Sequence, residues 1–215
     1  DSLVDFNVAG NYKVTVYLTT DFSVFATYTL YVRKPVEPGV YEGYYEKLDG
    51  LTGIELNNEL RDLIRNTGTS TGSTAQVKSV DRVGTSYYLI YDGMGSYGNR
   101  EHVWPNSKLG SVKYDLHNLR AAKTSTNSAR LNYPFADNNK PFTGSQPYEK
   151  IGSTWYPGDK HIGDVARIVF YISIRENLSL NLVGNVDLFL EWHELDPVDD
   201  FEINRNDNIF EIQNN

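Results

Sequence analysis

The first part of the chain alternates apolar and polar residues with the period of a β-strand. The alternation runs through residues 11–20 and again through residues 23–33, and a turn near Asp21 separates the two runs. This pattern predicts a β-hairpin. Because two strands bury too little surface to be stable alone, we expect the hairpin to belong to a larger β module.

The pattern changes after residues 34–40, where two prolines and a glycine break both helices and strands and indicate a linker. Thr52 and Glu55 have the spacing of a capping box, which predicts a helix start there. Three further helices are predicted at residues 159–177, 187–195 and 198–212. The first of these is so apolar that we expect it in the core, with Asp164 in its first turn.

The middle of the chain predicts two strands followed by a helix. A buried strand at 87–91 and a glycine-rich loop lead into the N-R-E-H-V-W-P stretch at 99–105. The second strand is expected around residues 117–121, and Ser125 or Thr126 is expected to cap the helix that follows. The loop lacks a Gly-Lys-Ser/Thr sequence, which excludes a phosphate-binding P-loop.

Candidate chemistry lies in this strand–strand–helix unit. Glu101 and His102 are neighbours, and neighbouring side chains of a strand point to opposite faces unless a twist or bulge brings them to one cleft. Asn127 and Arg130 are three residues apart, so they share one face of the predicted helix. Mg²⁺ prefers oxygen ligands and keeps several waters, and a neutral imidazole suits a general base. These residue types fit metal-assisted phosphodiester hydrolysis.

Composition narrows the class of protein. The chain has 215 residues, of which 40% are hydrophobic, and no Cys, which excludes disulfides and thiolate metal sites. The longest apolar run, residues 165–174, is too short to span a bilayer and contains Arg167. The net charge of −8 argues against a nucleic-acid partner. Residues 81–150, however, hold 9 Lys or Arg against 6 Asp or Glu, so the part that carries the Glu-His pair is basic.

Four stretches of the chain together resemble the endonuclease I family, bacterial extracellular or periplasmic nucleases of the His-Me finger (ββα-metal) class. They are NREHVWPNSKLG, DLHNLRAAKTSTNSARLNYPF, YPGDKHIGDVARIVFYISIRE and WHELDPVDDFEINRNDNIFEIQ. The resemblance covers about residues 41–215. It implies an α+β fold, a mainly helical nuclease domain built around a ββα-metal motif. It also implies one Mg²⁺ ion, with Mn²⁺ or Ca²⁺ as alternatives, and a secreted or cell-surface location.

The resemblance further implies non-specific cleavage of double- or single-stranded DNA, and of RNA in many relatives, to products with 5′-phosphate ends. We expect the enzyme to be a monomer. The family's general base falls on His102, and its metal ligands fall on Glu101 and Asn127. These assignments come from matching the family's motifs residue by residue.

Other family positions are less clearly matched. The family's Asp-Leu-His-Asn-Leu box falls on residues 115–119, and we expect His117 to orient the ββα unit by hydrogen bonding rather than to act as a second base. The arginine that grips the scissile phosphate in some relatives has no clear counterpart. Arg130, Arg120 and Arg100 are the candidates, and Arg130 has an alternative role, pairing with a nearby carboxylate.

Residues 1–33 resemble the last strands of a bacterial immunoglobulin-like module. Some relatives carry disulfides, which this chain cannot form, and the family usually continues past its last helix with an Asn-Arg-Asn-Pro-Phe segment. Because the sequence ends at Asn215, we expect the family domain to extend further. The alternative function is a catalytically inactive surface-binding or adhesion protein. A zinc hydrolase lacks ligands, since the chain has neither Cys nor H-E-x-x-H.

Overall fold

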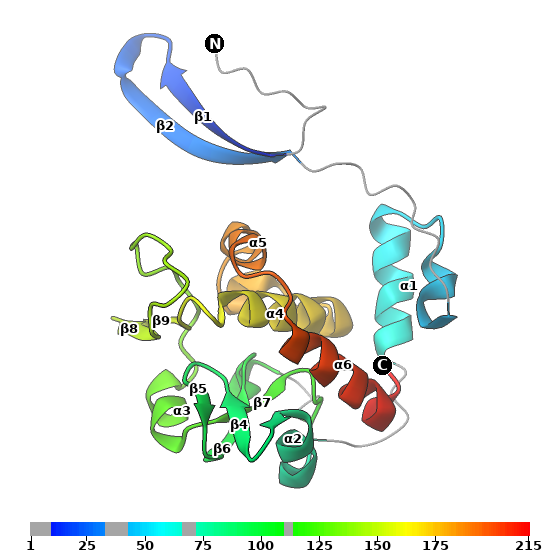
Figure 1. Cartoon of the computed structure of the whole chain (residues 1–215). Coiled ribbons are helices and arrows are strands. Elements are labelled where there is room, and N and C mark those ends of the chain that lie inside the picture. The colour runs from blue at the N-terminus through cyan, green and yellow to red at the C-terminus, as the bar shows by residue number, and fades with distance from the viewer. Residues whose placement is uncertain (1–9, 33–42, 66–71, 110–113) are drawn as a thin grey trace. The chain divides into compact units, whose positions relative to one another are not determined.

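The computed structural model describes residues 10–32, 43–65, 72–109 and 114–215 (Figure 1). The chain divides into two compact units, Asp1–Leu56 and Asn57–Asn215. The linker predicted at 34–40 lies outside the described residues. Helices and strands are both present, which confirms the predicted α+β class.

The first unit contains the predicted hairpin. Strands β1 (Gly10–Leu18) and β2 (Asp21–Val32) pair antiparallel, and a 3-10 helix, η1 (Gly43–Leu48), follows. Tyr17, Phe22 and Phe25 are exposed, and their rings cluster with centroids 5.7 and 6.2 Å apart. The resemblance to an immunoglobulin-like module stays a prediction.

Helix α1 (Gly53–Arg65) begins where the Thr52–Glu55 spacing predicts a helix start. The other helices of the second unit are α2 (Thr74–Val80), α3 (Thr124–Arg130), α4 (Ile162–Glu176), α5 (Val186–Leu195) and α6 (Asp200–Gln213). Two short 3-10 helices, η2 (Asn106–Lys108) and η3 (Leu180–Leu182), complete the set. The three C-terminal helices predicted from periodicity are therefore confirmed.

Among the described residues, the strands of the second unit form three small antiparallel sheets. They are β3 (Arg82–Val83), β4 (Ser86–Leu89) and β5 (Gly93–Gly95); β6 (Asn99–His102) with β7 (Leu119–Ala122); and β8 (Glu149–Ile151) with β9 (Thr154–Tyr156). The buried strand expected at 87–91 is thus shorter, and part of the glycine-rich loop after it is strand β5. Pairing with β4 draws Gly93–Gly95 into the sheet.

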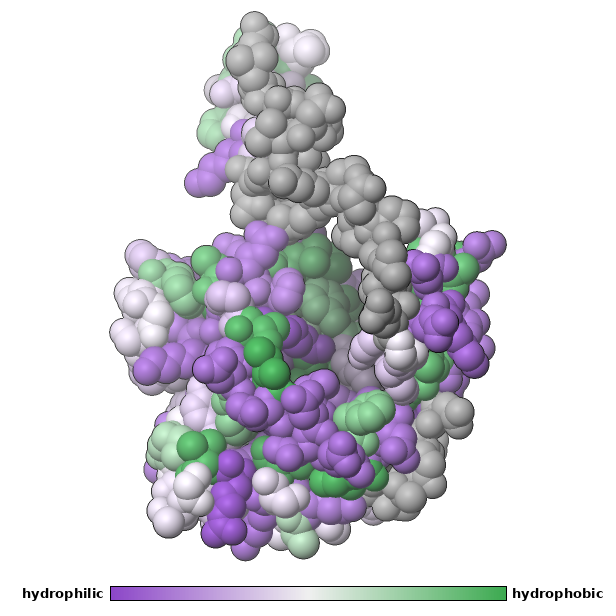
Figure 2. All heavy atoms as spheres, turned by 45° about the vertical axis from the view of Figure 1, so that its right-hand side comes forward, coloured by the Kyte–Doolittle hydropathy of each residue, from purple (hydrophilic) through white to green (hydrophobic). Residues whose placement is uncertain are grey.

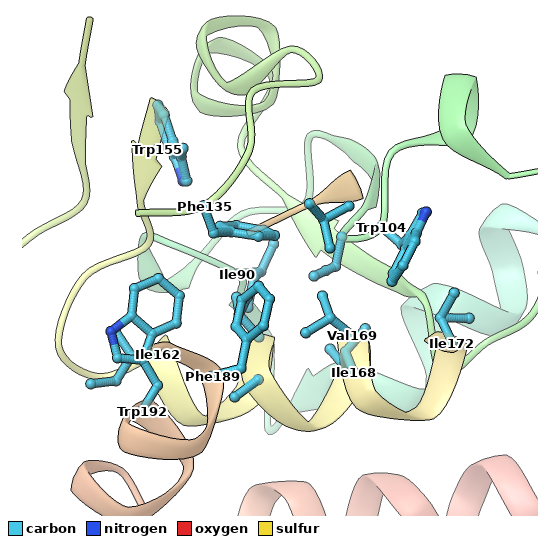
Figure 3. Packing of buried hydrophobic residues seen from close by; sticks show 14 of the residues in the cluster. Ile90, Trp104, Phe135, Trp155, Ile162, Ile168, Val169, Ile172, Phe189 and Trp192 are labelled. Carbon is cyan, nitrogen blue, oxygen red and sulfur yellow. The ribbon is translucent and has the colours of Figure 1, made fainter. Parts of the chain in front are cut away.

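The main core forms around α4, as its apolar sequence predicts. Figure 3 shows Ile168, Val169 and Ile172 projecting from α4 toward the layer that holds Trp104 and Phe135. Helix α5 adds Phe189 and Trp192, which pack edge-on against Phe135 at centroid distances of 6.2 Å. Burial of large apolar and aromatic side chains of this kind is the dominant stabilising contribution in a core.

The start and end of α4 are each set by local chemistry. Asp164 lies in the first turn, where a negative charge is favoured by the helix dipole. Asn177 ends the helix in the left-handed conformation, with φ 54°, and its N–H donates to the carbonyls of Ile174 and Ser173. Asp164 also carries a buried ion pair described below.

The central strand–strand–helix unit is present, with two corrections. Strand β7 begins at Leu119, so His117 precedes it rather than lying on it. Helix α3 has Lys123 at its N-cap with no side-chain capping bond, so neither Ser125 nor Thr126 is the cap. Thr126 is instead buried in the first turn, where its hydroxyl donates to Asp92 Oδ1 at 3.0 Å.

The side chain of Asn118 extends the β6–β7 pair beyond its last register pair, His102 and Leu119, and beyond the backbone bond from Val103 N to Asn118 O. Trp104 N donates to Asn118 Oδ1 at 2.7 Å, and Asn118 Nδ2 donates back to Trp104 O at 3.0 Å. A buried amide can thus replace the missing backbone partner of Trp104. These two hydrogen bonds therefore hold Trp104, which follows β6, against Asn118, which precedes β7.

The face seen in Figure 2 is largely hydrophilic, with apolar residues in small separate patches. Within the part of the chain that the structure describes, none of the helices combines the length and apolarity needed to cross a bilayer.

Candidate active site

Strand β6 and helix α3 meet at the candidate site. Asn99 and Glu101 are two positions apart on β6, so they share one face of the strand. That face contacts α3 through Asn127 and, one turn later, through Arg130. The residues predicted as metal ligands therefore come from two elements that are bonded to each other.

Glu101 is buried, with 3% of its surface exposed. The Tyr91 hydroxyl donates to its Oε1 at 3.1 Å, and Arg130 Nε lies 3.7 Å from the same oxygen. Burial raises the pKa of Glu101 to about 7, although Arg130 and the hydrogen bond from Tyr91 both act to lower it. The surrounding positive charge therefore does not fully compensate a negative charge at this carboxylate.

Arg130 lies behind Glu101 and is fully buried. Its terminal nitrogens donate to the carbonyls of Tyr133 at 2.6 Å and Val103 at 3.3 Å, and its guanidinium stacks 4.3 Å from the Phe135 ring. The ion pair with Glu101 corresponds to the alternative role considered for this residue, rather than to a contact with substrate phosphate. Arg130 anchors the carboxylate from inside the protein.

Asn127 is fixed by two hydrogen bonds from its amide nitrogen. Nδ2 donates to Asn99 Oδ1 and to Arg100 O, each at 3.0 Å. Because a backbone carbonyl can only accept, the Arg100 contact determines which end of the amide faces β6. The carboxamide oxygen of Asn127 is therefore directed away from these two acceptors, as a metal ligand requires.

His102 follows Glu101 on β6 and is partly exposed, whereas Glu101 is buried. Consecutive strand residues point to opposite faces, so the imidazole and the carboxylate leave β6 on different sides. Its neighbour across the sheet is Leu119. This position gives the ring partial access to solvent.

Arg120, the second arginine candidate, is buried and belongs to an ion-pair chain. Its Nη1 lies 2.9 Å from Asp164 Oδ2 and its Nε 3.6 Å from Asp81 Oδ1, and Arg205 Nε reaches Asp81 at 2.5 Å. Burial opposes the charge of Arg120, but Asp164 and Asp81 raise its pKa overall. This arginine links β7 to α4 and the end of α2 in the interior of the protein, away from any phosphate in solvent.

Arg100 is the arginine candidate that is partly exposed, and its Nη1 donates to Gly72 O. His117 contacts the other end of the chain, with Nε2 3.2 Å from Asn215 O and its ring 4.4 Å from that of Tyr171. Burial lowers the pKa of His117. Its contacts are those of a structural hydrogen-bonding residue.

The donor set suits a hard cation. Glu101 and Asn127 supply a carboxylate and a carboxamide oxygen, and the incompletely compensated charge of Glu101 favours a nearby cation. Arg130 Nε, although close to Glu101, makes no hydrogen bond. Among the described residues, no group of three or more His, Cys, Asp or Glu is arranged to hold a metal. A metal here would thus depend on this carboxylate–amide pair and on water.

Two contributors to the site are absent from the sequence-based assignment. Asn99 orients Asn127, and its position two residues before Glu101 on one strand was a usable signal. Tyr91 binds Glu101 from a different sheet, and nothing in the local sequence indicates that contact.

Comparison with known proteins defines the class. A family profile described as Endonuclease I matches residues 73–215, so the chain belongs to the Endonuclease I family. It is therefore a nuclease, a hydrolase of phosphodiester bonds.

Among its relatives, the chain is 33% identical to a protein named extracellular ribonuclease from Bacillus subtilis (strain 168), over 78% of this chain and 71% of that protein. It is 31% identical to an extracellular ribonuclease of Bacillus amyloliquefaciens, over 79% of this chain and 71% of the relative. A third relative, named Endonuclease-1, comes from Buchnera aphidicola subsp. Acyrthosiphon pisum (strain APS). It is 29% identical over 55% of this chain and 48% of its own length.

Proposed function

We propose that this protein is a secreted, Mg²⁺-dependent endonuclease that cleaves DNA and RNA without sequence preference and leaves 5′-phosphate ends. The observation that carries the proposal is the bonding of β6 to α3, which brings the carboxylate of Glu101 and the amide of Asn127 to one interface. We further propose that β6, β7 and α3 are a His-Me finger. The names of the relatives support the secreted location and cleavage of RNA.

The residues divide the work of hydrolysis. Glu101 and Asn127 would hold one divalent ion, which when bound neutralises negative charge that develops on the phosphate. His102, partly exposed at the end of β6, would accept a proton from the attacking water. Arg130 and the amide of Asn99 keep the two metal-binding side chains in place from behind.

Lack of sequence preference has a physical basis in this assignment. Contacts to phosphate carry no information about base sequence. The basic composition of residues 81–150 favours approach of a polyanion to this part of an otherwise acidic chain. We assign the phosphate contact to Arg100, because Arg100 is partly exposed whereas Arg120 and Arg130 are both buried.

A nicking assay on supercoiled plasmid, run beside a structureless RNA substrate, tests the proposal. Wild-type protein should cleave both with Mg²⁺ and neither with a chelator. The His102→Ala variant should lose about 10²–10⁴ in rate, the usual contribution of a general base. His193→Ala, which alters an exposed histidine on α5, is the control and should keep full activity. Unchanged cleavage by His102→Ala would exclude this base, and binding without turnover under any divalent ion would favour a binding protein.

A further inference from the structure

We propose that Tyr91 is a positioning residue that holds the Glu101 carboxylate for its metal ion, an inference that rests on the proposed function. The two residues are each 3% exposed, and the Tyr91 hydroxyl donates to Glu101 Oε1 at 3.1 Å. A carboxylate has about four lone-pair positions, so one hydrogen bond fixes its orientation and still leaves room for a cation. Outer partners that orient a ligand in this way commonly tune metal affinity.

The backbone of Tyr91 gives an independent reason to look for a role. Leu89 pairs with Gly93 across the β4–β5 hairpin, so Tyr91 is the middle residue of the three-residue loop between them. Its φ is 75°, in the left-handed region where glycine or asparagine is the usual occupant. A bulky side chain in this conformation is strained, and such strain is often found at functional sites. The loop keeps an aromatic residue despite this strain.

Two contacts compensate for the strained backbone. The Tyr91 ring packs edge-on against Trp155 with centroids 5.5 Å apart. Ile90 N, next to it, donates to Ala121 O at 2.9 Å, which ties the loop to β7. Phenylalanine would meet the demand for packing equally well, so the contact that distinguishes tyrosine at this position is the hydroxyl on Glu101.

The test is Tyr91→Phe in the complete chain, with Tyr148→Phe as a matched control. Tyr148 stacks on the same Trp155 at 5.0 Å, and its hydroxyl meets Thr126 at 3.5 Å rather than Glu101. Calorimetry gives the dissociation constant for Mn²⁺. Plasmid nicking gives the Mn²⁺ concentration needed for half-maximal cleavage. Tyr91→Phe should raise both values about 10-fold or more. Tyr148→Phe should leave both near the wild-type values.

Equal Mn²⁺ affinity and activity in Tyr91→Phe and an active wild type would overturn the positioning role and leave the proposed function intact. Wild-type protein that neither binds Mn²⁺ nor cleaves nucleic acid would overturn both. If Tyr91→Phe is less stable, the comparison moves to a Glu101→Gln background. There Tyr91→Phe should reduce the residual activity no further, because the hydroxyl acts through Glu101. A loss of equal size in both backgrounds would overturn the proposal.

Discussion

The side chains of Asn99 and Asn127 are joined by a hydrogen bond of 3.0 Å, from the amide nitrogen on α3 to the amide oxygen on β6. The same nitrogen also donates to Arg100 O at 3.0 Å. Both hydrogens of the Asn127 amide are therefore used within the β6–α3 interface. The orientation of the Asn127 oxygen is therefore set by β6 as well as by α3, which carries Asn127.

Removing the side chain of Asn99 should weaken the site without unfolding the protein. Asn99→Ala deletes one of the two acceptors of Asn127, a loss of about 1 kcal/mol. We expect the metal concentration for half-maximal cleavage to rise roughly fivefold, since a loss of about 1 kcal/mol in metal binding corresponds to this factor. Asn99→Asp keeps an acceptor oxygen at the same place and should restore most of the affinity. Metal titrations of the two variants that coincide would contradict this role.

Arg130 and Glu101 should be energetically coupled. Arg130→Met removes the buried cation 3.7 Å from Glu101 Oε1, and breaking a buried pair from one side costs about 3–5 kcal/mol. In a Glu101→Gln background no carboxylate charge remains to be compensated, so the same substitution should cost less. Urea unfolding of the two single variants and the double variant gives the coupling free energy directly. Additive losses would show that Arg130 acts mainly through its carbonyl contacts.

The Asp159 carboxylate should stabilise the folded protein above about pH 4, and this stabilisation should be lost as the pH falls below that value. Burial alone would raise its pKa, but hydrogen bonds from Tyr156 and from the backbone of Gln146 and Thr143 lower it to about 2. A carboxyl whose pKa is lower in the folded state stabilises above its unfolded pKa and loses that stabilisation as the pH falls toward 2. Asp159→Asn should cost about 1.5–3 kcal/mol at pH 7. The free energy of unfolding should also decrease less in Asp159→Asn than in the wild type as the pH falls from about 4 toward 2.

His117 should make the protein less stable as the pH falls below about 6.5, the ordinary histidine pKa. Its pKa is lowered by burial first and by Arg205 and Arg175, against the opposing effect of Asp115. Below this pH the unfolded chain binds a proton that the folded chain does not bind. The free energy of unfolding therefore decreases as the pH is lowered in this range. His117→Gln should reduce the change in melting temperature between pH 7 and 5.

If His117→Gln and wild type show parallel curves, the imidazole takes up its proton in the folded protein as readily as in the unfolded chain.

The periodic segments were predictable from sequence, because each of them carries its own signal. The apolar run of α4 and the alternation in β1 and β2 depend only on neighbouring residues. The error at His117 arose from turn chemistry, since its N–H donates to Asp115 Oδ1 at 2.8 Å and so forms a turn before β7. An aspartate at this place was a signal that could have been used.

The remaining features depend on contacts distant in sequence. The hydroxyl of Thr126 binds Asp92, 34 positions earlier, and so does not cap its own helix. Whether an arginine meets phosphate or a buried carboxylate depends on where α4 and α6 pack, which no local pattern contains. Arg120 illustrates this, since its partner Asp164 lies 44 positions away.

Arg205 of α6 bonds to residues that are synthesised much earlier than Arg205 itself. It donates to the carbonyls of Leu116 at 2.8 Å and Leu119 at 2.6 Å, in the turn that enters β7, and it pairs with Asp81. During translation these acceptors are synthesised more than eighty codons before Arg205. Until Arg205 has been synthesised, the carbonyls of Leu116 and Leu119 therefore lack the partner that they have in the folded protein.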